Sequence, residues 1–269
     1  MIVSASLLQA IDVRKSYGAV VALHCASISA EAGKVNCLLG DNGTGKSTFI
    51  NILCGVETPD SGAVLMKGEP VTFSNPKAAL DRGIATVFQD LAMVPIMPVF
   101  RNFFLGNEPT KGHGLFRRFD TKRAIEMTLS ELDHIGIRLR DPRRPISTLS
   151  GGERQCVAIA RAVHFGAKVL ILDEPTSALG VKQAEIVLEH VVEVCRRGVA
   201  VILVTHNPQH AYAVGDSFTI VKQGESSAHW LKSEIMLTEL VMEMAGREGF
   251  ERPSIFLQAG GAPAGRAQA

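Results

Sequence analysis

The sequence predicts an α/β fold with a mostly parallel core sheet, an antiparallel β subdomain and a helical subdomain. Three observations lead to this prediction. An apolar strand at 35–39 runs through a glycine-rich loop into a helix, helices and apolar strands alternate between 151 and 204, and short alternating runs fill 6–30. Strand and helix alternation is typical of parallel sheets, whereas short half-polar strands pair antiparallel.

Composition sets the class of protein. The chain has 269 residues, of which 46% are hydrophobic and 20% charged, with a net charge of +1. This is enough chain to bury one large domain, and basic and acidic residues are spread along it. A nucleic-acid surface needs clustered lysine and arginine, so we expect no nucleic acid partner.

Cysteine usage and hydropathy indicate a compartment. The five cysteines stand singly without a C-x-x-C pair, as expected of buried thiols under reducing conditions. No basic residue precedes Arg14, so we expect no secretory signal. Uncharged stretches such as 91–100 are shorter than the roughly 20 residues of a membrane span. We therefore expect a cytosolic chain that meets a membrane only through a partner.

The first third of the chain reads as small strands. We expect antiparallel strands within 6–30, broken at Tyr17–Ala19, and a second hairpin over 64–73. A helical pattern begins at Pro76, and 84–88 reads as a buried strand. These strands form the predicted antiparallel subdomain and part of the core.

The character of the chain changes between 91 and 149. Prolines and a glycine-rich stretch precede an amphipathic helix from Thr121 to about Gly136, so we expect a helical subdomain over about 91–165. The prediction is one domain over 1–257 and a disordered Gly/Ala/Pro tail over 258–269.

The parallel core continues after this insert. The pattern predicts helices at 151–166 and 181–196 and strands at 169–172 and 199–204.

The glycine-rich loop carries the strongest chemical signal. It has the form G-x-x-x-x-G-K-[ST], in which backbone N–H groups and a helix N-terminus surround phosphate oxygens. Lys46 would meet the β- and γ-phosphates, and the Ser47 hydroxyl would meet Mg²⁺. The predicted nucleotide-binding residues of this loop are Gly40, Asp41, Asn42, Gly43, Thr44, Gly45, Lys46, Ser47 and Thr48.

Two carboxylates follow the strand 169–172. Ligands of open α/β sheets gather at the carboxyl ends of strands, so Asp173 and Glu174 are expected beside the phosphate loop. Asp173 suits a role near Mg²⁺, and Glu174 stands where a base for water could act.

A second helix start lies at Leu149-Ser150-Gly151-Gly152-Glu153. A serine N-cap followed by glycines leaves bare N–H donors that could meet phosphate. Taken alone, the same residues are more simply an ordinary helix cap.

The order of these motifs resembles the nucleotide-binding subunit of ATP-binding cassette (ABC) transporters. The phosphate loop, Gln89, Ser150–Gly152, Asp173–Glu174 and His206 after a strand occur in that order, and the resemblance covers about residues 7 to 225. It implies a P-loop NTPase fold of the ABC ATPase type and an enzyme that hydrolyses ATP with Mg²⁺.

The resemblance also implies individual roles. Tyr17 would stack on adenine, Gln89 would touch Mg²⁺ and sense the membrane subunit, Glu174 would polarise the attacking water, and His206 would hydrogen-bond the γ-phosphate. Ser150, Gly151, Gly152 and Glu153 would form the signature that closes on ATP held by a second subunit. Alone, Tyr17 could be an edge-strand aromatic and His206 a turn residue. The other histidines, such as His24, have no expected chemical role.

A finer resemblance points to ATPases of bacterial ribose, xylose and fructose importers. It rests on Asp90–Pro95, Phe104–Pro109 and Thr176–Val181. It implies a polytopic permease and a periplasmic sugar-binding protein as partners, and a location at the cytoplasmic face of the inner membrane. With a single cassette, the chain should pair with itself or with a sister subunit to import a monosaccharide or a polyol.

Two residues depart from the common ABC pattern. Gly180 replaces an aspartate that supports the dimer interface, and Glu153 replaces a glutamine, so we expect a modest effect on turnover. The alternative function is that of a soluble ABC ATPase with a mechanochemical or regulatory role. The chain shows none of the coiled-coil inserts, tandem cassettes or basic patches that a mechanochemical protein would have, and the presence of Glu174 and His206 counts against a regulatory module without hydrolysis.

Overall fold

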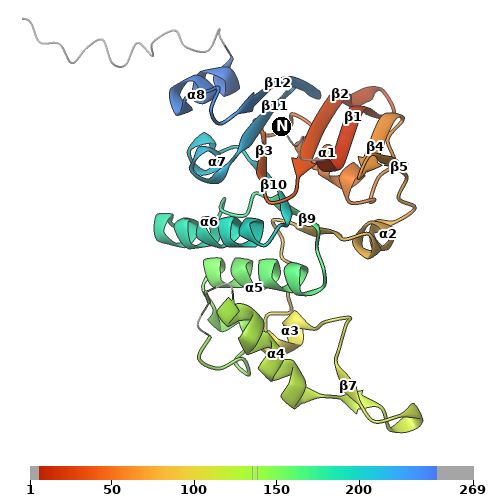
Figure 1. Ribbon diagram of the computed structural model, residues 1–269, viewed down its shortest axis with the longest axis vertical. Coiled ribbons are helices and arrows are strands. Elements are labelled where there is room, and N and C mark those ends of the chain that lie inside the picture. Colours follow the sequence, from red (N-terminus) through yellow and green to blue (C-terminus); the bar gives the residue numbers. More distant parts are fainter. Residues whose placement is uncertain (1–5, 135, 138, 247–269) are drawn as a thin grey trace, which may run out of the picture.

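The computed structural model describes residues 6–134, 136–137 and 139–246 (Figure 1). The predicted disordered tail, 258–269, lies outside the described residues. In the described part of the chain, no helix is long and apolar enough to cross a membrane.

Within the described residues, ten strands form one continuous sheet in the order β5-β4-β1-β2-β12-β11-β3-β10-β9-β6. Its parallel half contains β3 (Val35–Leu39), β6 (Ile84–Val87), β9 (Val169–Asp173), β10 (Ala200–Thr205) and β11 (Ser217–Lys222). Its antiparallel half contains β1 (Ser6–Tyr17), β2 (Val20–Glu31), β4 (Ser61–Met66) and β5 (Glu69–Val71). The strand β12 (Glu225–Leu231) joins the halves, because it pairs with β11 and, through Glu225 and Cys25, with β2.

Helices cover the sheet and build a separate lobe (Figure 1). The helices are α1 (Lys46–Leu53), α2 (Pro76–Asp81), α3 (Val99–Phe103), α4 (Thr121–His134), α5 (Gly151–His164), α6 (Val181–Arg196), α7 (Pro208–Val214) and α8 (Leu237–Ala245). The lobe contains α3 and α4 packed on α5, and a two-stranded hairpin of β7 (Thr110–Lys111) and β8 (Arg118–Phe119) projects from it.

The core explains why the parallel strands are apolar throughout. Along β9, Leu170 and Leu172 pack into one hydrophobic cluster, whereas Val169 and Ile171 pack into the cluster on the opposite face. Burial of a Leu or Ile side chain contributes roughly 1.5–3 kcal/mol, so both faces of this strand stabilise the sheet. The helical lobe has a third cluster that includes Phe103, Phe104 and Leu132.

The observed architecture confirms the predicted α/β fold with its antiparallel β and helical parts. Most boundaries differ by a residue or two, as at α5, which ends at His164, whereas the hairpin predicted over 64–73 is formed by β4 and β5 and begins three residues earlier, at Ser61. The β7–β8 hairpin and the elements after Thr205 have no counterpart in the sequence prediction.

Candidate functional site

A cavity of about 480 Å³ lies at the carboxyl ends of the parallel strands, where an open α/β sheet places its ligands. It brings together predicted residues from α1, β9 and three loops. Those that line it are Asn42, Gly43, Gly45, Lys46, Ser47, Thr48, Gln89, Asp173 and Glu174.

Glycines of the phosphate loop are required by close backbone approach. Gly45 has φ +101°, and a Cβ there would lie 2.6 Å from the carbonyl oxygen of Ala22. Gly40 has φ +155°, and its Cβ would lie 2.4 Å from the carbonyl oxygen of Val221. The loop is therefore fixed against β2 and β11 in a shape that no side chain at these positions would permit.

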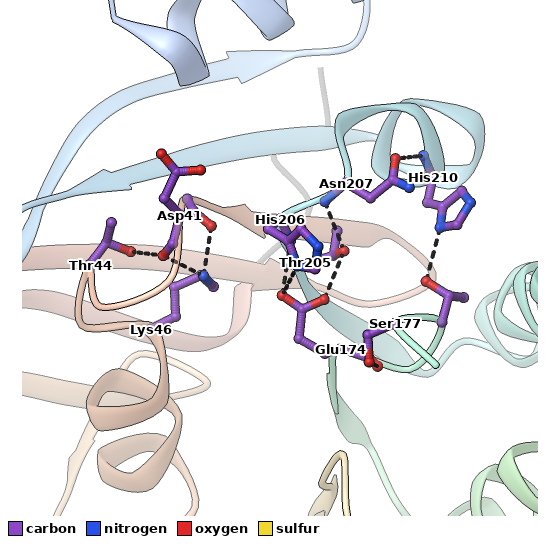
Figure 2. A network of polar contacts seen from close by, with 11 residues as sticks. Asp41, Thr44, Lys46, Glu174, Ser177, Thr205, His206, Asn207 and His210 are labelled. Carbon is purple, nitrogen blue, oxygen red and sulfur yellow. Dashed lines mark hydrogen bonds and ion pairs between the residues drawn. The ribbon is translucent and has the colours of Figure 1, made fainter. Parts of the chain in front are cut away.

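Lys46 is held inside this loop. Its side-chain Nζ donates hydrogen bonds to the carbonyl oxygens of Gly40 at 2.6 Å and Asp41 at 2.8 Å (Figure 2). The residue is only 7% exposed, and burial lowers the pKa of its ammonium group, against the opposing charges of Glu174 and Asp173. Among the described residues, the hydrogen-bond partners of this ammonium group are carbonyl oxygens and not carboxylates, and a charged donor of this kind can bind phosphate oxygens.

Glu174 is held by the end of β10. Its Oε1 accepts hydrogen bonds from the backbone nitrogen of His206 at 3.0 Å and from Nδ1 at 2.8 Å, and its Oε2 accepts one from the Thr205 hydroxyl at 3.2 Å (Figure 2). Glu174 also has φ 47°, a left-handed conformation that turns the chain sharply after β9. Since a carboxylate oxygen has two lone pairs, Oε2 keeps one for a further donor such as water.

The same contact restricts what His206 can do. An ionised carboxylate only accepts, so Nδ1 of His206 carries the proton in this hydrogen bond. If Nε2 is also to donate to a phosphate, the imidazole must carry both protons.

Three oxygen donors in the cavity fit a magnesium ion. The Ser47 hydroxyl, the Gln89 amide and the Asp173 carboxylate all line it, and Mg²⁺ binds few protein oxygens together with phosphate and water. Burial raises the pKa of Asp173, as does the nearby charge of Glu174, while Lys46 lowers it. Among the described residues no group of three or more His, Cys, Asp or Glu could hold a metal ion.

The signature residues lie apart from this cavity. Ser150 caps α5, where its hydroxyl accepts from the Glu153 nitrogen at 3.3 Å and Glu153 Oε2 accepts from the Ser150 nitrogen at 2.7 Å. A Cβ on Gly151 would lie 2.7 Å from the Leu179 side chain, and one on Gly152 would lie 3.1 Å from Gln183. Both glycines therefore let α5 pack closely on the start of α6, and none of the four predicted signature residues lines the cavity.

Some predicted residues stand outside the cavity and some lining residues were not predicted. Tyr17 is 45% exposed at the end of β1, with the Lys15 ammonium 5.6 Å from its ring centroid. Four other predicted residues also do not line the cavity, although they shape its loop or hold Glu174. They are Gly40, Asp41, Thr44 and His206.

Two polar residues that were not predicted do line the cavity, namely His24 and Gln223. The pairing of β2 with β12 brings His24 and Gln223 together, and no local sequence pattern predicts that contact.

Comparison with known proteins agrees with this geometry. The family model described as ABC transporter matches residues 23–177. The xylose/arabinose import ATP-binding protein XylG of Sulfolobus acidocaldarius is 41% identical over 238 residues, covering 88% of this chain and 93% of that protein. The fructose import ATP-binding protein FrcA of Rhizobium meliloti is 37% identical, covering 90% of this chain and 94% of that protein.

A longer relative and two solved structures extend the comparison. A putative ribose/galactose/methyl galactoside import ATP-binding protein of Halalkalibacterium halodurans is 35% identical over 90% of this chain but only 46% of its own length. An ATP-binding cassette of an ABC transporter in its ADP conformation has a TM-score of 0.78 at 23% identity, covering 94% of this chain and 99% of that one. A dimeric post-hydrolysis cassette bound to ADP and Pi has a TM-score of 0.70 at 24% identity, covering 84% and 98%.

Proposed function

Because the chain belongs to the ABC transporter family and is an ATPase of that family, we propose that it powers the import of a monosaccharide or related polyol through a partner permease. The support is that two relatives matched over nearly their whole length are named as import ATP-binding proteins for xylose/arabinose and for fructose. These relatives favour import over a soluble mechanochemical or regulatory role.

The proposed chemistry divides the cavity into a binding part and a reacting part. The loop from Gly40 to Thr48 would bind the triphosphate, Tyr17 would stack on adenine, and Ser47, Gln89 and Asp173 would hold Mg²⁺. When bound, Mg²⁺ would neutralise charge on the phosphates. Glu174, through the free lone pair of Oε2, would orient the attacking water and accept its proton, and His206 would donate to the γ-phosphate.

A dimer completes the proposed site. The observation that carries this is the separation of Ser150–Glu153 from the cavity that holds Lys46 and Glu174. A helix N-terminus with bare donors and no side chains on its two glycines suits the γ-phosphate of a nucleotide bound to another copy. Two chains would close head to tail around two ATP molecules. Because ATP would bind only the closed state, its hydrolysis would let the two chains separate.

A groove beside Gln89 suits the permease. It has a volume of about 250 Å³ and is lined by Leu91, Met93, Asn107, Arg161 and Phe165, between the segment after β6 and α5. The Arg161 guanidinium donates to the Leu105 carbonyl at 2.8 Å, so the segment that leads to Asn107 is hydrogen-bonded to α5. A short permease segment seated here would move with Gln89 and so sense the state of the nucleotide.

This function places the chain at the cytoplasmic face of the inner membrane, with a periplasmic sugar-binding protein delivering substrate to the permease. The test is reconstitution of the chain with a candidate sugar permease of the same organism, together with the matching binding protein. We expect ATP hydrolysis to rise when sugar-loaded binding protein is added and labelled sugar to enter the vesicles. ATP hydrolysis that does not respond to the loaded binding protein, with no labelled sugar entering the vesicles, would contradict the transport assignment.

A further inference from the structure

The β7–β8 hairpin has no part in the nucleotide cavity or in the groove. It projects from the helical lobe at the end of the molecule opposite α8 (Figure 1). It begins at Thr110, shortly after Asn107, a residue of the groove proposed to receive the permease. We call residues 110–119 the lobe hairpin and ask what its surface can bind.

The base of the lobe hairpin is firmly anchored. Phe119 stacks on Phe100 of α3, with ring centroids 6.1 Å apart, and the Arg101 guanidinium lies 5.1 Å from the Phe119 centroid. The backbone nitrogen of Asp120 donates to the Pro109 carbonyl at 2.7 Å, and Lys111 Nζ lies 3.6 Å from Asp120 Oδ1. These contacts hold the hairpin as a fixed extension of the lobe.

The tip presents one large apolar side chain to solvent. Phe116 is 87% exposed, although it belongs to an ordered turn in which its nitrogen donates to the His113 carbonyl at 3.1 Å. Gly112 closes this turn, because a Cβ there would lie 2.4 Å from the Phe116 carbonyl oxygen. Phe119 and Phe116 are three residues apart, yet one anchors the hairpin and the other meets water.

Exposed cations surround this aromatic ring. Arg117 and Arg118 are both exposed, and in the described part of the chain no carboxylate lies within ion-pair distance of either. Further basic side chains stand on the nearby lobe surface. The acidic ones there are Glu108, Asp120, which pairs with Lys111, and Glu126, which pairs with Lys122 at 3.9 Å. The basic residues of the hairpin and its surroundings are Arg101, Lys111, Arg117, Arg118, Lys122 and Arg123.

We propose that the lobe hairpin is a membrane-surface contact, with Phe116 entering the interface of an anionic bilayer and Arg117 and Arg118 binding lipid phosphates. Arg117 Nε donates to the Thr110 hydroxyl at 2.7 Å, which leaves its other guanidinium N–H groups for a ligand. An aromatic ring flanked by exposed arginines without a carboxylate partner among the described residues is the chemistry that binds such an interface. A fluid headgroup layer can accept a protruding ring without any shaped cleft on the hairpin. A protein partner would more commonly bind to a cleft, and the hairpin presents a protruding ring instead. The inference rests on the proposed function only in placing the chain beside a membrane.

The test uses the purified full chain and vesicles of phosphatidylcholine with or without a quarter of phosphatidylglycerol. We expect co-sedimentation with the anionic vesicles that weakens in high salt. Each arginine near an anionic surface contributes roughly a fivefold change in partitioning, so Arg117→Ala with Arg118→Ala should reduce binding about tenfold or more. Phe116→Ser should also reduce it, and the control pair Lys77→Ala with Arg196→Ala, which removes exposed charges elsewhere, should not.

A fluorescent variant reports insertion directly. Phe116→Trp adds a second tryptophan to Trp230, which packs against the core and serves as the internal reference. We expect quenching by brominated lipid in the variant and none in the parent.

Failure of this proposal is separable from failure of the transport assignment. Equal vesicle binding by the parent and by the hairpin variants, or no binding by parent protein that hydrolyses ATP normally, would overturn it. If the hairpin variants bind vesicles normally but no longer recover the permease, the hairpin contacts protein and the proposal is also wrong. If the reconstitution with a permease fails, the vesicle binding of the purified chain would still be expected.

Discussion

Nδ1 of His206 lies 2.8 Å from Oε1 of Glu174, so the residue that directly follows β10 fixes the carboxylate that directly follows β9. Two parallel neighbouring strands, paired in register from Val169 with Ala200 to Asp173 with Val204, bring these residues to one edge. The pairing of β9 with β10 therefore positions the two proposed catalytic residues next to each other.

We expect Glu174→Gln to abolish most ATP hydrolysis while ATP still binds. The amide keeps the shape of the side chain but cannot accept a proton from water, and loss of such a group costs about 10²- to 10⁴-fold in rate. Phosphate release and equilibrium nucleotide binding measure the two effects. Glu185→Gln, on the exposed face of α6, is the control that should keep the parent rate. Hydrolysis by the Glu174 variant at the parent rate would show that the assignment is wrong.

Lys46→Ala should remove ATP binding. The ammonium group that now bonds the Gly40 and Asp41 carbonyls would no longer be available to the phosphates. A hydrogen bond to a charged group contributes roughly 1.5–3 kcal/mol, and Lys46 faces more than one phosphate, so affinity should fall by about a hundredfold or more. Isothermal titration calorimetry measures it, with the exposed Lys77→Ala as control. Unchanged affinity would exclude Lys46 from the binding site.

Asp173→Asn should stabilise the nucleotide-free protein and weaken its response to Mg²⁺-ATP. Burial and the Glu174 charge raise the pKa of Asp173, so the ionised carboxylate destabilises the native state above its native pKa. That cost disappears as pH falls through the native pKa, because the carboxyl is then protonated. We expect the variant to unfold roughly 1–3 °C higher at neutral pH and the difference to shrink in acid, measured by thermal unfolding. A difference that grows in acid would contradict this reasoning.

Gly180→Asp should stabilise α6. Gly180 is the N-cap of that helix, with φ −69°, ψ 159° and no side-chain cap, and its Cβ direction is open. An aspartate there can accept from the first free N–H groups and meets the positive helix end, together worth about 0.3–1 kcal/mol. Thermal unfolding should show a rise of about 1–3 °C, with only a modest change in turnover. Gly180→Ala, which fills the space without an acceptor, should give no gain.

The sequence allowed much of this fold to be predicted because its signals are local. The apolar run before Asp173 identifies a strand buried on both faces, and the glycine spacing before Lys46 identifies the loop. The β7–β8 hairpin escaped prediction because each strand has two residues, too few for an alternating pattern to show.

The candidate site was predictable only in part for a different reason. His24 and Gln223 meet in the cavity because β12 connects the two halves of the sheet, a tertiary pairing with no local signature. For Glu153 the structure adds a role that the sequence did not predict. The sequence leads us to expect only a modest effect on turnover from its replacement of glutamine, whereas the structure shows its carboxylate completing the cap of α5.

The crystal structure of the Glu174→Gln variant with Mg²⁺-ATP tests the central claim most directly. The account predicts two chains closed head to tail, with each γ-phosphate lying between Lys46 of one chain and the N-terminus of α5, at Ser150, of the other. A nucleotide wholly enclosed by one chain, with Ser150 of the second chain far from it, would contradict the account.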